Sequence, residues 1–413
     1  MIRLLAGLAS LGWWSLLASQ PVPATPACAD GWTPPAGPGI EVNSVAGLEG
    51  ALRSASPGDT ILLADGDYAL RAMLDISVPD ITIRSASGDP SKVVLHGRGM
   101  VGDAVGVAIS VSAPGATVAD LTVRDVGYHA IQVRGERGAS RFTLHNARLL
   151  DTGQQLLKGS VSANPIYADD GLVACSEFSY TTSAPSDYTN AVDLLATRGW
   201  VIRDNRFLRI RGPESQGWRS GPTILIWKAS EATVVERNVI IDSFRGIAFG
   251  LEPGPAPLSR NGPHDYDHLG GVIRNNVVVN LNSWADEAIE ANAARDVRIE
   301  HNTVLAESRN APWSIGVRFP AAYAVVRNNL TNLPLQRRNG GRADTEANIF
   351  NATRSWFMDP TKQDLRLATG SSPAIDTAAA IPDVTDDFDR VPRPQGRGPD
   401  IGAFEFRPPP IVR

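Results

Sequence analysis

Short apolar runs recur along the middle of the chain, and each is interrupted by the same polar motif. Six segments read as an apolar strand, a polar residue, an asparagine and a second apolar strand: residues 141–151, 200–210, 233–243, 271–281, 297–307 and 324–333. Their asparagines are Asn146, Asn205, Asn238, Asn276, Asn302 and Asn329. Because the runs are short and separated by Gly, Asn and Asp, the pattern predicts strands and leaves no room for helices.

A third short apolar run completes each repeat, as in residues 129–135, 190–196, 222–228, 246–250, 287–293 and 314–320. The last two intervals between the asparagines are 26 and 27 residues, which suits one turn of a three-strand coil. In such a coil the asparagines recur at one corner, where each amide can bond the next amide and the turn backbone. The pattern predicts an all-β fold, a right-handed parallel β-helix over residues 31–355, in which this asparagine column is structural.

The two ends of the repeat have different patterns. Asn43 or Ser44 can cap a short helix that places Val45, Leu48 and Leu52 on one face, so a helical cap is expected before the first strands. Residues 356–413 resemble a C-terminal segment common on secreted bacterial β-helix proteins, and we expect them to form a tail that folds back and caps the last turn. The acidic stretch DVTDDFD in the tail is interpreted as a solvated loop, with calcium binding as the alternative.

The first residues have the build of a secretory signal peptide. Arg3 precedes the apolar run LLAGLASLGWWSLLA, which is followed by small residues and prolines. Residues 1–30 are therefore interpreted as a signal peptide, and a membrane anchor is the alternative. We expect a secreted, periplasmic or cell-surface protein that has no membrane segment after cleavage and is a monomer.

Composition and cysteine content narrow the classes of function. The 413 residues carry a formal net charge of −5 with 20% charged residues, which is unlike a nucleic-acid-binding protein. The only two cysteines, Cys28 and Cys175, can form one disulfide in an oxidising compartment. If Cys28 is removed with the leader, Cys175 is instead a small core residue. Two cysteines so placed do not build a metal site.

The strand alternation predicts a shared polar surface. Successive side chains of a strand point to opposite faces, so five residues of the third run should project outward from stacked strands: Gln132, Arg134, Asp193, Glu290 and Arg318. A face several turns long suits an extended polymer. Four tryptophans on or beside the loops could stack on sugar rings or, equally, cover apolar edges: Trp218, Trp227, Trp284 and Trp313.

The sequence resembles a known family of secreted polysaccharide lyases, the chondroitinase B and alginate lyase type. The resemblance covers about residues 40–335 and is carried by VNSVAGLEGALRSASPGDTILLADGDY, PDITIRSASGDPSKVVLHGRG and ILIWKASEATVVERNVIIDSFRGIAFG. It implies a parallel β-helix that cleaves a uronate polymer by β-elimination, with a lysine base and an arginine partner. Lys228 matches the lysine. A cation must neutralise the uronate carboxylate, whether arginine, lysine or Ca²⁺.

The chain departs from that pattern at several positions. Leu251 stands where the arginine is expected, and Arg245 lies nearby but before the strand. Thr223 and Gly221 occupy the positions of two calcium-holding acidic residues, so no cofactor is required and calcium is left open. Strand parity also turns Lys228 inward unless the chain bends at Trp227.

Other polar residues supply further candidates. Lys158, with Arg134, is a second basic centre; Gln155 is a binding residue beside it; and His129 is a candidate acid or base, or a turn residue bonded to backbone. A glycosidase that uses a pair of carboxylates remains an alternative. The candidate carboxylates are Asp169, Asp170, Asp193, Glu287 and Glu290. The loop NGPHDYDHLGG is interpreted as a polar rim, with a metal site at His264, Asp265, Asp267 and His268 as the alternative.

These observations favour a polysaccharide lyase. Lys228 would be the base, with Arg245, Arg318 or Lys158 as partners and His129 as a further candidate. Substrate would be bound by Gln132, Arg134, Gln155, Asp193, Trp227 and Glu290. The alternatives are a glycosidase that uses Asp170, Asp193 and Glu290, and a non-catalytic glycan-binding or adhesive surface protein.

Overall fold

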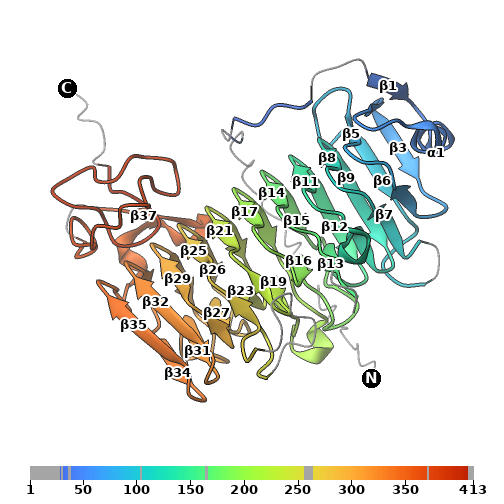
Figure 1. The fold of residues 1–413 in the computed structure, drawn as a ribbon. Coiled ribbons are helices and arrows are strands. Elements are labelled where there is room, and N and C mark those ends of the chain that lie inside the picture. Colours follow the sequence, from blue (N-terminus) through green and yellow to red (C-terminus); the bar gives the residue numbers. More distant parts are fainter. Residues whose placement is uncertain are drawn as a thin grey trace, which may run out of the picture.

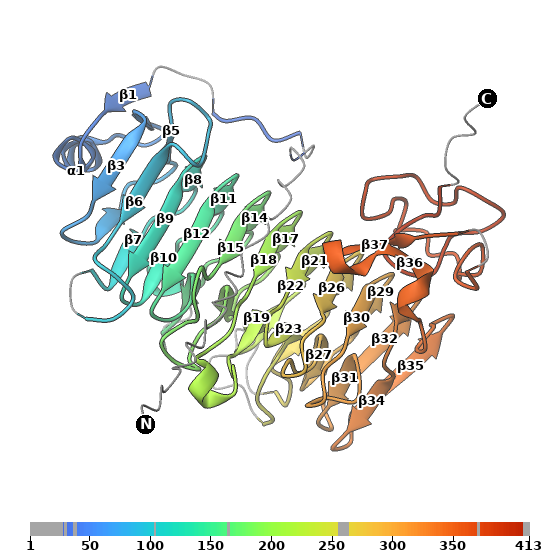
Figure 2. The ribbon, with the colours of Figure 1, turned by 180° about the vertical axis from the view of Figure 1, so that it is seen from behind.

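A computed structural model describes Cys28 and residues 31–35, 39–102, 105–162, 166–254, 264–369 and 372–407. Figures 1 and 2 show one elongated stack of short strands, with the N-terminal helix at one end and an irregular C-terminal segment beside the other. The leader predicted over residues 1–30 lies outside the described residues, except for Cys28. No helix of the described part is long and apolar enough to cross a membrane.

Three long sheets of parallel strands form the stack, and we name them sheets A, B and C. In the described residues sheet A has twelve strands, in the order β1 (Gly39–Val42), β2 (Thr60–Leu63), β5 (Thr82–Ser85), β8 (Thr117–Ala119), β11 (Thr143–His145), β14 (Leu172–Ala174), β17 (Val201–Arg203), β21 (Val234–Glu236), β25 (Val272–Arg274), β29 (Val297–Glu300), β32 (Tyr323–Arg327) and β35 (Arg342–Glu346). Sheet B has ten: β3 (Gly66–Ala69), β6 (Val93–His96), β9 (Thr122–Val126), β12 (Arg148–Thr152), β15 (Glu177–Ser179), β18 (Arg206–Leu208), β22 (Val239–Ile241), β26 (Val277–Asn280), β30 (Thr303–Ala306) and β33 (Leu330–Thr331).

Sheet C also has ten strands in the described part: β4 (Leu74–Ile76), β7 (Val107–Val111), β10 (His129–Arg134), β13 (Leu157–Ser160), β16 (Val192–Leu195), β19 (Pro222–Trp227), β23 (Arg245–Phe249), β27 (Ile289–Asn292), β31 (Ile315–Arg318) and β34 (Leu335–Arg338). Short strands β20 (Ser230–Glu231), β24 (His268–Leu269) and β28 (Ala294–Arg295) form a small sheet at the corner between sheets C and A. The chain visits A, B and C in turn, so the predicted right-handed parallel β-helix is confirmed.

One continuous apolar core runs through the stack. Each strand turns alternate side chains inward, as with Ile131 and Val133 of β10 and Ile289 and Ala291 of β27, all of which are fully buried. The same register repeats on neighbouring strands, where Ile131 pairs with Leu157. Burying about 25 cal/mol per Å² of apolar surface along the stack is the main stabilising contribution to such a fold.

The asparagine column lies at the corner between sheets A and B. Asn205, Asn238, Asn276 and Asn302 each donate a side-chain N–H to the side-chain oxygen of the next asparagine, at 2.9–3.0 Å. Each also has its backbone N–H bonded to that oxygen, at 3.0–3.1 Å. Asn329 extends the column to Asn348. The backbone N–H groups of these asparagines therefore have hydrogen-bond partners within the protein.

The prediction was wrong for Asn146, which lies outside this column. His145 pairs with Ala174, so Asn146 aligns with Cys175, and the column position is Ala147 followed by Ser176. Asn146 instead adopts a left-handed φ of 47° and donates to Asp120 at 2.7 Å. The chain places a residue of positive φ just before the column position, and Asn is one of the residue types that tolerates it.

The ends of the stack are covered by different means. Helix α1 (Val45–Ser54) is capped by Ser44, whose hydroxyl accepts from the Gly47 N–H at 3.2 Å, and its Leu48 is fully buried in the core. The tail folds back, as predicted, but its apolar residues Phe357, Leu365 and Ile401 pack on outward side chains of β26, β30 and β33. It contains the hairpin of β36 (Phe357–Asp359) and β37 (Asp364–Leu367). The described part of the tail therefore covers the outer face of sheet B, and its Asp383 also bonds Arg274 and Arg298 of sheet A.

Replacing Asn276 tests the column. Asn276→Ala removes the donors to Val235 O, Arg274 O and Asn302, and the acceptor for Asn238, all of which are buried or partly buried. We expect the free energy of unfolding to fall by about 2–4 kcal/mol. Urea unfolding followed by circular dichroism measures it. Asn351→Ala, at an exposed asparagine, is the matched control, and equal losses for both variants would contradict a structural column.

Candidate functional site

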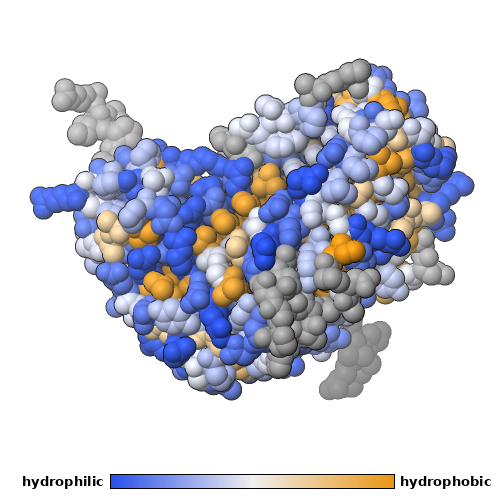
Figure 3. Space-filling model, viewed as in Figure 1, coloured by the Kyte–Doolittle hydropathy of each residue, from blue (hydrophilic) through white to orange (hydrophobic). Residues whose placement is uncertain are grey.

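Sheet C carries a column of outward side chains that crosses the whole stack. The strand registers align ten positions in order: Asp75, Ser110, Gln132, Lys158, Asp193, Leu225, Ala248, Glu290, Gly316 and Gln336. Arg134 and Arg318 lie two residues further along their own strands. The five predicted residues therefore lie on the outer face of sheet C, where Asp193 and Glu290 are almost fully buried by their neighbours. The space-filling view shows small hydrophobic groups set among hydrophilic residues on one face of the molecule (Figure 3).

The first polar group on this face is centred on Asp193. Its carboxylate is almost fully buried, pairs with the Lys158 ammonium and accepts from the indole N–H of Trp227 at 2.8 Å. Gln132 lies beside Lys158 on the next strand. Because the charges of Asp193 and Lys158 compensate one another, this group is held as a rigid, neutral unit.

Three further predicted residues lie next to this group. Arg134 donates to the Ser110 hydroxyl at 2.8 Å and pairs with Glu136 at 3.4 Å. His129 Nδ1 lies 3.2 Å from the Gln155 carbonyl, and the Gln155 side chain donates to Asn190 at 3.3 Å. Burial, and more weakly the charges of Lys158 and Arg134, lower the pKa of His129 to about 4. His129 is therefore neutral at pH 7 and has no proton to give as an imidazolium.

Lys228 lies at the corner beyond sheet C. Strand β19 ends at Trp227, and Lys228 takes a left-handed φ of 57°, so it does not follow the strand alternation inward. Its backbone N–H donates to Asp267 at 2.8 Å, its ammonium pairs with Glu252, and its Nζ lies 4.4 Å from the centre of the Trp227 ring. The chain therefore bends directly after Trp227, which is the condition under which strand parity does not turn Lys228 inward.

Lys228 and Arg245 do not meet. Arg245 begins β23 and pairs in register with Pro222, the first residue of β19, whereas Lys228 follows the last. Six residues of extended strand separate Pro222 from Lys228, or about 20 Å. The lysine and the arginine that we expected to act together lie at opposite edges of sheet C.

A cluster of carboxylates and arginines occupies the other edge. Arg245 binds Glu290 through two guanidinium N–H groups, one of them at 2.7 Å, and Asn292 donates to the same carboxylate at 2.7 Å. Glu287 reaches over Gly316, beside Glu290, and pairs with Arg338. Asp286 directly precedes Glu287 in the loop before β27. Three carboxyl groups therefore share one turn.

Crowding and burial shift the proton affinities of these groups. Burial, followed by the nearby charge of Glu290, raises the pKa of Glu287 to about 7. The same two causes raise the pKa of Asp286. Glu290 differs from these two groups in its contacts, because the Arg245 guanidinium binds both of its carboxylate oxygens. A carboxyl group with a raised pKa is a candidate proton donor in acid catalysis.

A hollow of about 550 Å³ opens beside this cluster. Its lining comes from segments that precede or begin strands β16, β19, β23, β27 and β31: Asp187, Arg219, Ser220, Gly221, Phe244, Arg245, Asp286 and Asn310. Two carboxylates, Asp187 and Asp286, and two guanidinium groups, Arg219 and Arg245, thus face one space. Such a mixture suits a polar ligand that has both hydrogen-bond donors and acceptors.

Aromatic residues stand next to the hollow. Trp218 precedes Arg219, Trp284 lies two residues before Asp286, and the two indole rings are 5.6 Å apart. The Arg211 guanidinium lies 4.4 Å from the Trp218 ring and 5.3 Å from the Trp284 ring. Both tryptophans are half-buried, so each keeps part of its ring exposed.

The remaining predicted residues lie elsewhere or have other partners. Arg318 aligns with Asn292 and Arg338 on sheet C, with its guanidinium 4.5 Å from the Phe319 ring. Asp169 accepts from the Arg198 N–H at 2.9 Å at the corner between sheets C and A, and Asp170 lies next to it. Asp193 and Glu290 are three strands apart, about 14 Å. The glycosidase set of Asp170, Asp193 and Glu290 is therefore not brought together.

The loop that contains Asp265 and Asp267 does not assemble a metal site. Asp267 accepts backbone N–H groups of Lys228, Leu251 and Glu252 at 2.8–3.1 Å. Asp265 pairs with Arg295, and the buried His268 stacks on Phe249 with its Nε2 3.2 Å from Thr233. Asp265, Asp267 and His268 therefore each contact a different partner and do not converge on one point. Asp267 instead fixes the backbone of the corner.

The residues at the expected calcium positions do not fit that ion. Thr223 is fully buried and donates its hydroxyl to the Arg245 carbonyl at 2.6 Å, and Gly221 has no side chain. Calcium requires six to eight oxygen ligands, usually with several carboxylates. Thr223 and Gly221 supply no carboxylate.

Sequence reasoning did not identify Asp187, Arg219, Asp286 or Asn310 as site residues. They lie on loops that break the repeat, so no periodic signal marks them. The available signal was positional, because each of these loops directly precedes a strand of sheet C. Residues before the third run of every repeat were therefore worth comparing as a group.

Similarity to known proteins is found in the fold alone. No protein-family model matches the sequence, and no curated protein matches it. Among solved structures, the pectate lyase Pel9A is similar over 87% of this chain and 90% of its own, with 16% identity and a TM-score of 0.55. A rhamnogalacturonan lyase is similar over 76% and 85%, with 10% identity and a TM-score of 0.50. An alginate lyase from Paenibacillus sp. str. FPU-7 is similar over 75% and 99%, with 15% identity and a TM-score of 0.45.

The raised pKa of Glu287 makes a prediction about stability. Its value of about 7 exceeds the ordinary 4.5, so the folded state holds the proton more tightly than the unfolded state. The free energy of unfolding should therefore fall as pH rises from about 4.5 to about 7. Glu287→Gln should reduce that fall by roughly 1–3 kcal/mol.

Urea unfolding at a series of pH values measures this slope. Glu41→Gln, at an exposed glutamate of β1, is the matched control and should keep the slope of the unsubstituted protein. A slope that is unchanged by Glu287→Gln would contradict the raised pKa.

Proposed function

We propose that the protein hydrolyses glycosidic bonds of a polysaccharide that lies along sheet C and enters the hollow between Asp187 and Asp286. The observation that carries this proposal is the pair of carboxyl groups facing one space, one of them with a raised pKa. Glycoside hydrolysis uses two carboxyl groups, about 5–10 Å apart, of which one donates a proton to the leaving oxygen.

Asp286 is the proton donor in this proposal. Burial and the charge of Glu290 keep it protonated to higher pH than an ordinary aspartate. Asp187, which is exposed on the opposite loop, is the second carboxylate and acts as base or nucleophile. Arg245 holds the Glu290 carboxylate in place, and the charge of Glu290 adds to the effect of burial on the pKa of Asp286. Glu290 is therefore a positioning residue rather than a catalytic one.

The other lining groups suit a sugar chain. Arg219, Ser220 and Asn310 offer donors and acceptors for hydroxyl or carboxylate substituents. Trp218 and Trp284 offer ring faces beside them. The outer face of sheet C extends from the hollow over many strands, with apolar Leu225 and Ala248 beside it and polar residues from Asp193 to Asp75 beyond, and a face of this length suits a polymer better than a small molecule. The fold is shared with two proteins named as lyases of polysaccharides, which supports the same class of ligand.

β-Elimination with Lys228 as the base has weaker support. Its ammonium is paired with Glu252 and lies about 20 Å along the strand from Arg245. A base must also reach the proton that it removes, and the Lys228 ammonium is engaged by the Glu252 carboxylate. Action outside the cytoplasm is consistent with the disulfide between Cys28 and Cys175, which requires that the expected leader be cleaved before Cys28 rather than after residue 30.

Product analysis of three matched variants tests this proposal. Purified protein is incubated with neutral and uronate polysaccharides, and reducing ends and absorbance near 235 nm are recorded. We expect new reducing ends without a rise in absorbance, and a loss of at least about 100-fold in rate for Asp286→Asn and for Asp187→Asn. Asp67→Asn, at an exposed aspartate of β3, should retain the full rate.

Two results would contradict the proposal. A rise in absorbance that Lys228→Ala abolishes would establish elimination at the opposite edge of sheet C. Full hydrolytic activity in Asp286→Asn would remove that residue from catalysis. The pH profile adds a check, because protonated Asp286 is required and the rate should fall as pH rises through its raised pKa.

A further inference from the structure

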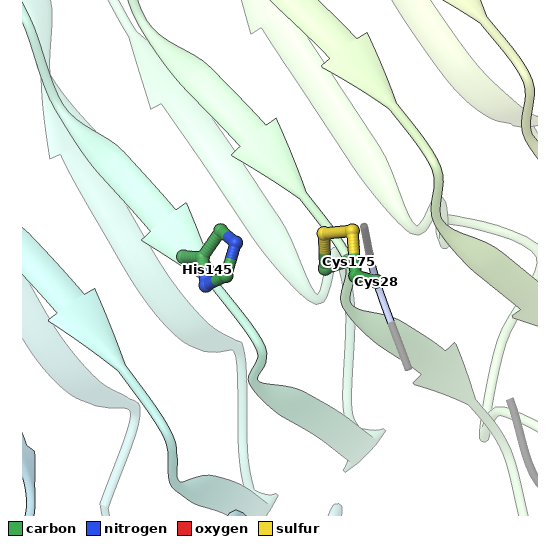
Figure 4. Close-up of side chains that lie close together, drawn as sticks. All are labelled: Cys28, His145 and Cys175. Atoms are coloured by element: carbon green, nitrogen blue, oxygen red, sulfur yellow. A yellow bond between two sulfur atoms is a disulfide. The ribbon is translucent and has the colours of Figure 1, made fainter. Parts of the chain in front are cut away.

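Three potential metal ligands gather at a corner that the proposed hydrolysis does not use. Cys28 and Cys175 form a disulfide, and ligand atoms of both cysteines and of His145 all lie within 4.8 Å of one another. Figure 4 shows that they come from three segments: His145 ends β11, Cys175 follows β14, and Cys28 belongs to the N-terminal segment. Within the described residues this is the one group of three such side chains.

The structure holds this group in place from both sides. Cys175 aligns with Asn146, the residue after His145, because His145 pairs in register with Ala174. The Trp32 ring stacks on the His145 ring with centres 4.1 Å apart, which fixes the imidazole and ties the N-terminal segment to the same corner. Cys28 is half-buried, whereas Cys175 and His145 are buried. A reductant can therefore reach the disulfide from the side of Cys28.

We propose that reduction of the Cys28–Cys175 disulfide converts this corner into a Zn²⁺ site. A dithiol reductant supplies two electrons and two protons and is itself oxidised to a disulfide, leaving Cys28 and Cys175 as thiols. Zn²⁺ then binds both sulfur atoms and a nitrogen of neutral His145, and the two thiol protons are released. Water completes the fourth position, as in zinc sites with three protein ligands.

The spacing requires only a small rearrangement. Zinc binds sulfur at about 2.3 Å and histidine nitrogen at about 2.0–2.1 Å, so tetrahedral ligands lie about 3.3–3.8 Å apart. The sulfur atoms must separate after reduction, and the nitrogen must approach by up to about 1 Å. Cys28 lies outside the three sheets, so it can adjust while β11, which ends at His145, and β14, which directly precedes Cys175, stay fixed. Thiolate and imidazole ligands favour zinc over calcium or magnesium.

Zinc titration of the reduced protein tests this site. The full chain is reduced, freed of reductant without oxygen, and titrated with Zn²⁺ by calorimetry and with Co²⁺ by visible absorption. We expect one ion per chain, the charge-transfer band of cobalt–thiolate bonds, and no binding by the oxidised protein. His145→Ala should weaken binding at least about tenfold, whereas His96→Ala, at a histidine of β6, should leave it unchanged.

Cys28→Ser provides a variant that leaves the β-helix intact, because this residue lies outside the sheets. It should abolish one-to-one binding while the circular dichroism spectrum stays the same. The proposal is overturned if the reduced protein binds no zinc, if binding survives Cys28→Ser, or if His145→Ala and His96→Ala bind equally well.

Discussion

Hydrogen bonds between successive turns align the strands of this molecule, and they require every turn to keep the register of the one before. A parallel strand offers its N–H and C=O groups to both neighbours, so a turn that slips by one residue would expose apolar side chains and bury polar ones. The asparagine column enforces the register from Asn205 to Asn348, because each amide bonds both the backbone and the side chain of the adjacent turn.

The fixed register also determines where polar groups can act. Outward positions on sheet C repeat at about 4.8 Å from strand to strand, so side chains far apart in sequence form one ordered surface. Loops can vary in length without disturbing that order, since both of their ends are held by strands. The hollow is built from such loops: Asp187, Arg219 and Asp286 are brought together only because the strands after them stack. A rigid scaffold thus supports variable chemistry along one edge.

Sequence patterns predicted the fold but only part of the site. Alternation and the recurring asparagines predicted three-strand turns and the outward positions of Gln132, Asp193 and Glu290, because both signals are periodic. Asn146 was assigned one residue from the column, since corner asparagines with positive φ and column asparagines look alike in sequence. Strand parity gives the direction of the Lys228 side chain only if the strand continues through it, and β19 ends at Trp227. Asp286 and His145 owe their neighbours to loops and stacking between turns, which local patterns do not encode.

A crystal structure of the Asp286→Asn variant with an oligosaccharide cut from the preferred polymer tests the central claim most directly. The account predicts sugar rings in the hollow, with a glycosidic oxygen within hydrogen-bond distance of residue 286, Asp187 on the other side of the bond, and further rings following sheet C. Sugar bound instead at the opposite edge, with its uronate carbon beside Lys228 and the hollow filled only by water, would contradict it.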